Sequence, residues 1–249
     1  FDLRTFALFP GVMPGRGRGS QRSLQVTTNV VTVRNYMAGD ALTRIHWAST
    51  ARHGELMVKE FDLDPTIDVM ILLDLDKDVH AGVDESSTEE YAVTIAASLT
   101  AFLLRQRDLA VALEAPGPSG VSLPLDRGDR QTDRALEALA IVRADRHISL
   151  ATALAEMEMR LPRNTVLIVI TPSDGLDWEQ QLGHLRRRGV RPVVVLLDPS
   201  TFDDQRGSLA RVEDALDGAG IPSVMIRRGD AMARVLETGA PGGVSKVTR

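Results

Sequence analysis

Three aspartates alternate with other residues in the segment DLDKD, which covers residues 74–78. Carboxylates at this spacing bind hard divalent cations, and Asp74, Asp76, Asp78 and Glu85 match positions 1, 3, 5 and 12 of a calcium loop. Against this, Val79 stands where such loops need glycine, and Asp74 is expected to end a strand rather than a helix. The segment predicts either a Mg²⁺ or Ca²⁺ site at Asp74, Asp76 and Asp78, or a solvated acidic rim that shapes the local potential.

A second polar segment, GDALTRIHWASTARHGELMVKEFD at residues 39–62, contains the Ser, His and Asp of a hydrolase. His46 and Ser49 are three residues apart on an expected short helix, so their side chains could meet. However, Asp40 is expected to cap that helix, and the sequence has no Gly-x-Ser-x-Gly nucleophile elbow. We favour a non-catalytic clasp that orders the segment against the following domain, with Trp47 buried. Arg44 and Arg52 would pair with carboxylates in it. Its expected members are Arg34, Tyr36, Gly39, Asp40, Arg44, His46, Trp47, Arg52, Gly54 and Glu60.

Composition narrows the possible functions. The chain has 249 residues, 43% of them hydrophobic and 25% charged, which is ordinary for a globular protein with a sizeable core. A net charge of −5 disfavours a nucleic-acid partner, and the absence of cysteine excludes disulfides and thiolate chemistry. No apolar run approaches the roughly 20 residues of a membrane span. Because the chain begins with Phe1 and no signal peptide is recognisable, we interpret it as a fragment of a longer protein.

From residue 63 onward, strand and helix patterns alternate. The run IDVMILLDL at 67–75 predicts a strand covered on both faces, and capping boxes at Ser86 and Ser87 predict a helix over 87–105. Two successive strands at 108–115 and 121–125 predict an antiparallel hairpin at one edge. Further helices are expected at 130–143, 149–160, 178–188 (capped by Asp177), 208–217 and from 230, and further strands at 165–170, 190–197 and 223–226. This alternation predicts a doubly wound, mostly parallel α/β sheet.

The predicted domain organisation has three parts. Residues 1–62 form a β-rich N-terminal arm that includes the clasp, residues 63–238 form the α/β domain, and residues 239–249 form a disordered tail. Within the arm, the segment PGVMPGRGRGSQR (10–22) is expected to be a loop.

The predicted strand order, with its single antiparallel edge strand, resembles the von Willebrand factor type A fold. The segment RNYMAGDALTRIHWASTARHGELMVKEFD (34–62) resembles the signature of the bacterial family called domain of unknown function 58. That signature runs Arg-x-Tyr-x-x-Gly-Asp, Arg-x-Ile-His-Trp, Ala-Arg-x-Gly, and a strand ending in Phe-Glu or Phe-Asp. A type A-like domain follows it in the family, so the resemblance covers nearly the whole chain. The matching positions are Arg34, Tyr36, Gly39, Asp40, Arg44, Ile45, His46, Trp47, Ala51, Arg52, Gly54, Leu56, Val58, Lys59, Glu60 and Phe61.

The resemblance also implies a degenerate metal-ion-dependent adhesion site. Type A domains carry Asp-x-Ser-x-Ser after the first strand, where this chain has three aspartates. Ile148 falls where the distal threonine is expected, with Ser149 the nearest hydroxyl. Pro172 replaces the aspartate of a later Thr-Asp-Gly, and Asp174 comes two residues late.

Members of the family are often encoded beside MoxR-type AAA+ ATPases and carry membrane helices upstream. The resemblance therefore implies a non-catalytic scaffold for a MoxR-type ATPase or its client, tethered to the membrane by a missing segment, with this domain in the cytoplasm. A cation-dependent ligand-binding module is the alternative, and a hydrolase is the third possibility. We expect a basic partner to meet the acidic face at Asp76, Asp78, Asp174 and Asp177. The loops of that face carry Asp74, Asp76, Asp78, Ser173, Asp174, Asp177, Asp198, Asp203 and Asp204.

Overall fold

The structure is a computed structural model that describes residues 1–8, 30–37, 40, 42–61, 67–106, 108–145 and 147–239. The chain divides into two compact units. The larger unit combines Phe1–Pro14 with Ile67–Arg249, and the smaller one is Gly15–Thr66. The predicted loop at 10–22 and the predicted tail beyond Gly239 lie outside the described residues.

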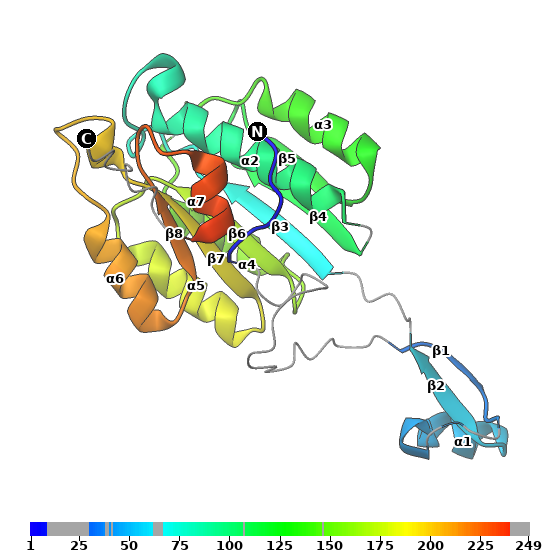
Figure 1. The fold of residues 1–249 in the computed structure, drawn as a ribbon. Coiled ribbons are helices and arrows are strands. Elements are labelled where there is room, and N and C mark those ends of the chain that lie inside the picture. The colour runs from blue at the N-terminus through cyan, green and yellow to red at the C-terminus, as the bar shows by residue number, and fades with distance from the viewer. Residues whose placement is uncertain are drawn as a thin grey trace, which may run out of the picture. The chain divides into compact units, whose positions relative to one another are not determined.

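A six-stranded sheet forms the centre of the larger unit, with the strand order β5-β4-β3-β6-β7-β8 (Figure 1). All neighbouring strands are parallel except β5, which pairs antiparallel with β4 at the edge. The predicted fold class and edge hairpin are confirmed. The strands are β3 (Ile67–Leu73), β4 (Leu109–Ala115), β5 (Val121–Asp126), β6 (Val166–Thr171), β7 (Arg191–Leu197) and β8 (Ser223–Ile226). The strand order reverses between β3 and β6, and ligands of open α/β sheets bind at the carboxyl ends of strands at such a point.

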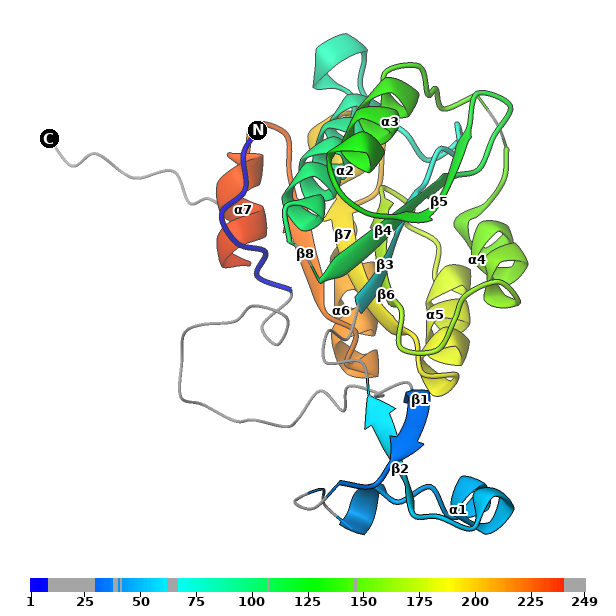
Figure 2. The same cartoon turned by 90° about the vertical axis from the view of Figure 1, so that its right-hand side faces the viewer.

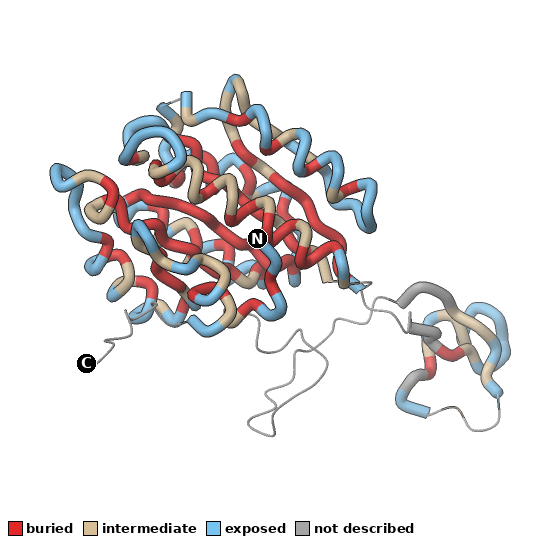
Figure 3. Tube along the Cα trace, turned by 45° about the horizontal axis from the view of Figure 1, so that its top comes forward, coloured by how far each residue is buried: buried red, intermediate tan, exposed pale blue. Residues whose placement is uncertain are grey.

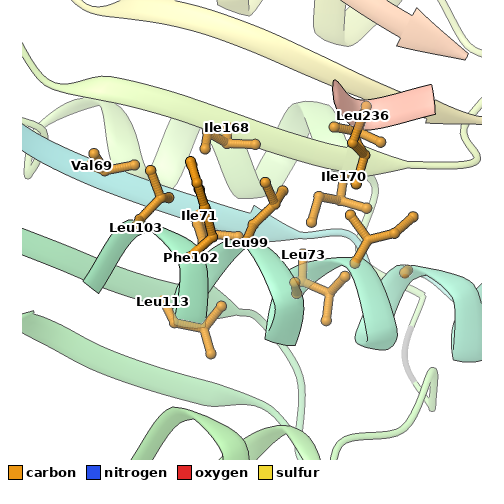
Figure 4. Close-up of a cluster of buried hydrophobic side chains, with 14 of the residues drawn as sticks. Val69, Ile71, Leu73, Leu99, Phe102, Leu103, Leu113, Ile168, Ile170 and Leu236 are labelled. Carbon is orange, nitrogen blue, oxygen red and sulfur yellow. The ribbon is translucent and has the colours of Figure 1, made fainter. Parts of the chain in front are cut away.

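Helices cover both faces of the sheet, as Figure 2 shows. Successive side chains of a strand point to opposite faces of the sheet, so Ile71 and Leu72 belong to different core clusters. The cluster of Ile71 includes residues of α2, α3 and α7, and the cluster of Leu72 includes residues of α4, α5 and α6. Figure 4 shows part of the first cluster, where Leu99, Phe102 and Leu103 of α2 pack near strand residues. The helices are α2 (Thr88–Leu104), α3 (Asp129–Leu139), α4 (Leu150–Glu158), α5 (Asp177–Arg187), α6 (Ala210–Ala219) and α7 (Met232–Thr238), with short 3₁₀ turns η2 (Asp84–Ser86) and η3 (Pro199–Thr201).

Two predicted helix caps are present. Ser87 accepts a hydrogen bond from the Glu90 amide at the start of α2, and Ser149 accepts one from the Thr152 amide at the start of α4. The predicted cap of α5 is wrong by one residue, because Asp177 is already helical and the cap position belongs to Leu176. No helix in the described part of the chain has the length and apolar character needed to cross a membrane.

The first residues of the chain belong to the larger unit. Leu3 and Phe6 are buried in the same core cluster as Leu236 of α7. The Ala7 amide donates a 2.8 Å hydrogen bond to the Leu236 carbonyl. The prediction that residues 1–62 form one arm is therefore wrong at its beginning, because two apolar side chains of this segment complete the core. Figure 3 shows how burial is distributed along the chain: β4, β6 and β7 are almost entirely buried, whereas the edge strand β5 is largely exposed.

The smaller unit is a hairpin with two short helical segments. Strand β1 (Val30–Asn35) pairs antiparallel with β2 (Met57–Phe61), and η1 (Leu42–Arg44) and α1 (Trp47–His53) lie between them in the sequence. Gly54, with a φ of +74°, ends α1 in the left-handed conformation that glycine adopts without steric cost. The helix predicted to start at Asp40 begins only at Trp47.

Candidate functional site at the carboxyl ends of the strands

Asp74 links the two central strands at the point where the strand order reverses. Its amide donates to the Ile170 carbonyl on β6, and the Thr171 hydroxyl donates a 2.6 Å hydrogen bond to its Oδ2. Its Oδ1 accepts the Asp76 amide at 3.1 Å. Burial, with only 3% of the residue exposed, raises the pKa of Asp74 to about 6, although these two hydrogen bonds act in the opposite direction. Both oxygens of Asp74 are thus occupied by structural hydrogen bonds.

The potential metal ligands at this edge are Asp76, Asp78 and His147. One ligand atom from each lies within 4.8 Å of the other two. Asp78 Oδ2 and His147 Nδ1 are 2.6 Å apart. Asp76 and Asp78 come from the loop after β3, whereas His147 comes from the loop before α4. Two carboxylates and one imidazole can bind a divalent cation.

This group corrects the predicted trio of Asp74, Asp76 and Asp78. Beyond the end of β3 the alternate spacing no longer places all three side chains together, and Asp74 turns toward Thr171 instead. Glu85, the last position of the calcium-loop spacing, is exposed in η2 and is not a member of the group. Sequence reasoning missed His147, although it directly precedes Ile148, the position expected for the distal threonine.

Two further side chains hold the loop after β3 in place. His80 contacts Thr88 Oγ1 through Nδ1 at 2.9 Å and the Asp74 carbonyl through Nε2 at 3.0 Å. Burial lowers the pKa of His80, so its imidazole is neutral at physiological pH. Arg206, from the segment between β7 and α6, donates to the Asp78 carbonyl at 2.7 Å and to the His80 carbonyl at 2.9 Å.

We define the carboxyl-end face as the loops that follow β3, β6 and β7. Asp174 and Asp177 are exposed here, and Asp174 lies beside Gly207, where a Cβ atom would be 3.6 Å from its Oδ2. Because Gly207 follows Arg206, the segment after β7 lies beside the loop after β6 at Asp174 and contacts the loop after β3 through Arg206 and Asp78. This connection brings Asp174 and the loop of Asp78 to one edge of the sheet.

The face is less acidic than the sequence suggests. Asp74 is buried, and so is Asp198, which accepts a 2.7 Å hydrogen bond from Ser200 and has Oδ2 3.7 Å from Arg227 Nε. Neither contributes an exposed negative charge, so the prediction that they belong to the exposed acidic face is wrong. The positive charges of Lys77 and Arg206 lie within or beside the same loops.

In the smaller unit, Asp40 has a different role from the predicted helix cap. Its two oxygens each accept a 2.8 Å hydrogen bond from the Arg34 guanidinium, and Oδ2 also accepts the Met37 amide at 2.9 Å. Such a bidentate pair fixes geometry as well as charge. Tyr36, in the segment that the pair spans, is partly buried. Gly39 and the side chains of Arg44 and Glu60 lie outside the described residues.

His46 and Ser49 do meet, as their spacing predicted. Ser49 Oγ lies 2.7 Å from His46 Nδ1, and the Ser49 amide donates to the same nitrogen at 3.3 Å, so His46 caps α1. The prediction that Trp47 is buried is wrong, because 68% of this residue is exposed at the first position of a helix without buried residues. Arg52 is also exposed.

Strand order and edge hairpin together define a von Willebrand factor type A-like α/β domain whose metal-site positions differ from the adhesion-site pattern. Residues 32–220 match the sequence profile of the family described as "Protein of unknown function DUF58". The chain belongs to this family, which confirms the resemblance of its signature.

Comparison with known proteins gives more distant relatives. Over 114 residues the chain is 28% identical to the uncharacterized protein YeaD of Bacillus subtilis, a match that covers 46% of this chain and 26% of YeaD. The chain therefore matches about a quarter of that protein's length.

Three solved structures illustrate the likeness of fold. Mussel byssus proximal thread matrix protein 1, with a zinc-occupied MIDAS motif, shares 11% identity at a TM-score of 0.47, over 70% of this chain and 46% of that one. Manganese-loaded TRAP protein of Plasmodium vivax shares 17% at 0.39, over 71% and 74%. The PilB minor pilin of Streptococcus sanguinis shares 8% at 0.44, over 72% and 61%. At these values nothing about ligands carries over to this chain.

Proposed function

We propose that this chain is a non-catalytic protein-interaction module that binds its partner through the carboxyl-end face. The observation that carries the proposal is the connection of the loops at this face. Asp74 joins the ends of β3 and β6 through Thr171, and Arg206 joins the segment after β7 to the loop of Asp78. A surface that is ordered before binding loses less conformational entropy when a partner binds.

The hydrogen bonds of the titratable side chains favour a role in recognition over a role in catalysis. Both oxygens of Asp74 and both ring nitrogens of His80 make hydrogen bonds within the protein. In the smaller unit, His46 caps a helix and Asp40 is held by Arg34, so the Ser, His and Asp of the signature do not make a relay. These contacts support the non-catalytic assignment.

For the partner we propose a MoxR-type AAA+ ATPase, or its client, with this chain as an accessory in the maturation of protein complexes. Members of the family that the signature resembles are often encoded beside such ATPases, which motivates this choice. The exposed carboxylates of Asp78, Asp174 and Asp177 suit a basic partner surface. In this proposal an upstream part of the protein tethers it to the membrane, and the domain faces the cytoplasm.

Charge reversal at the face tests the proposal. Asp174 and Asp177 are exposed and therefore suit charge reversal. Asp76 is nearly buried, so a lysine at this position would disturb the loop. We expect Asp174→Lys/Asp177→Lys to slow association with the purified ATPase several-fold at low salt, with a smaller difference at high salt because ions screen the exposed charges. Surface plasmon resonance in the presence of ATP and Mg²⁺ measures the association rate constant at each salt concentration.

The matched control is Asp133→Lys/Glu137→Lys, which makes the same charge change on exposed positions of α3. It should bind nearly as fast as the parent protein. If both double variants slow association equally, net charge alone acts and the face is not the binding surface. If the parent protein does not bind the ATPase or its client at all, the proposed partner is wrong.

A divalent-cation-dependent ligand-binding module is the second candidate, and the grouping of Asp76, Asp78 and His147 favours it. In that case EDTA should abolish partner binding, and the divalent ion should restore it. Binding that is unchanged in EDTA leaves the ion-independent interaction module as the function.

A further inference from the structure

We infer that Asp76, Asp78 and His147 form a site for a first-row transition-metal ion such as Zn²⁺, in preference to Mg²⁺ or Ca²⁺. This inference stands apart from the proposed protein partner, because the ion can bind whether or not the face recognises a protein. It also differs from the calcium or magnesium site expected from the spacing of the aspartates.

The donor atoms decide the class of metal. Mg²⁺ and Ca²⁺ prefer oxygen ligands alone, whereas an imidazole nitrogen favours Zn²⁺ and its first-row neighbours. Here one imidazole nitrogen lies 2.6 Å from Asp78 Oδ2, and all three ligand atoms lie within 4.8 Å of one another. Zinc bonds of about 2.0–2.2 Å require tetrahedral ligands about 3.3 Å apart. Asp78 and His147 are exposed, so small rotations of their side chains can supply this change.

The burial of Asp76 is the second observation that points to a cation. Only 9% of this residue is exposed. Among the described residues, its carboxylate accepts one hydrogen bond, from the Asp78 amide to Oδ1 at 3.1 Å, and has no ion-pair partner. The nearby guanidinium of Arg206 donates to main-chain carbonyls instead. A largely buried carboxylate without a counter-charge is costly, and a bound divalent cation would supply that charge.

A bound ion would join two loops that are far apart in the sequence. In the chain without metal, the Asp78–His147 contact connects the β3–α2 loop to the segment between α3 and α4. Replacing this exposed hydrogen bond by three metal bonds would restrain both loops at the carboxyl-end face. Three protein ligands also leave a coordination position for water or for a group of a partner.

Metal binding by the full chain, freed of metal by EDTA and dialysis, tests the inference. Isothermal titration with ZnCl₂, MnCl₂, MgCl₂ and CaCl₂ alone should show one Zn²⁺ bound at least about tenfold more tightly than Mg²⁺ or Ca²⁺. Saturating Zn²⁺ should raise the melting temperature by about 5 °C through mass action. Co²⁺ bound in place of Zn²⁺ has a visible absorption spectrum that depends on its ligands. This spectrum should be that of a site with nitrogen and oxygen ligands.

His147→Ala should weaken Zn²⁺ binding at least about tenfold and remove the Co²⁺ spectrum, while an unchanged circular dichroism spectrum shows that the fold is intact. The matched control is His184→Ala, an exposed histidine on α5, which should bind Zn²⁺ like the parent protein. Asp76→Asn should abolish binding. The inference is overturned if His147→Ala retains parental affinity, if His184→Ala alone loses the ion, if Mg²⁺ or Ca²⁺ binds as tightly as Zn²⁺, or if no ion binds at millimolar concentration. Because no partner is present, these results are independent of the charge-reversal experiment.

Discussion

The buried carboxyl of Asp74 should make the stability of the larger unit depend on pH, and Asp74→Asn should remove that dependence. Asparagine keeps an oxygen that can accept the Thr171 hydroxyl, so the link between β3 and β6 can persist. What it loses is the ionisation of a group with almost no contact with water. The variant therefore separates the cost of charge from the contribution of the hydrogen bond.

The magnitude follows from the pKa. Burial raises the pKa of Asp74 from 3.8 to about 6, and a difference of about two units corresponds to about 3 kcal/mol. Because the folded state holds the proton more tightly than the unfolded state, this stability is fully present below pH 3.8 and is lost as the pH rises through about 6. The free energy of unfolding of Asp74→Asn, relative to the parent protein, should thus increase by up to about 3 kcal/mol between pH 4 and pH 7.5.

Urea unfolding at a series of pH values, in EDTA to exclude metal ions, measures this difference. Any effect of the unpaired amide nitrogen of Asn adds a constant offset and leaves the dependence on pH unchanged. As a second variant, Thr171→Val removes the hydroxyl that lowers the pKa of Asp74, so the transition should move to higher pH. A difference between Asp74→Asn and the parent protein that is the same at all pH values would refute the reasoning.

Two further predictions concern positions whose burial in the structure differs from the prediction made from the sequence. Phe6→Ala should lower the free energy of unfolding by about 3–5 kcal/mol in urea titrations, because its ring is buried in the core. The same change at the exposed Phe1 should have little effect. Equal effects at the two positions would contradict the placement of the segment. Trp47→Ala should change the free energy of unfolding by less than about 0.5 kcal/mol, because the ring is exposed. A loss of several kcal/mol in the same titrations would show that the ring is packed after all.

The strands and most helices could be predicted because their signals are local. The apolar run of β3 reads directly as a strand buried on both faces, and Ser87 and Ser149 mark helix starts through hydrogen bonds that span three residues. Leu3 and Phe6 give no such signal. Two apolar residues in an irregular segment have no period, and only the tertiary fold shows that they complete the core beside α7.

The candidate site could be predicted in part. The alternate aspartates after the first strand of the larger unit pointed to the correct edge of the sheet, but not to the correct ligands. Asp74 differs from Asp76 and Asp78 because Thr171, almost a hundred residues later, accommodates its carboxyl group. His147 joins the group through a contact across 69 residues, which no local spacing encodes. Trp47 was expected to be buried in the clasp because of its residue type, but it lies exposed on α1, a helix without buried residues.

Hydrogen–deuterium exchange with the ATPase, or with its client, bound and unbound tests the central claim most directly, because it maps the partner surface without any substitution. If the carboxyl-end face is the binding surface, amides of residues 76–80, 147–149 and 174–177 should exchange more slowly in the complex, and those of α3 should not change. Protection confined to residues 42–56, where Leu42, Trp47 and Leu56 are exposed, would contradict the account and place the partner on the smaller unit.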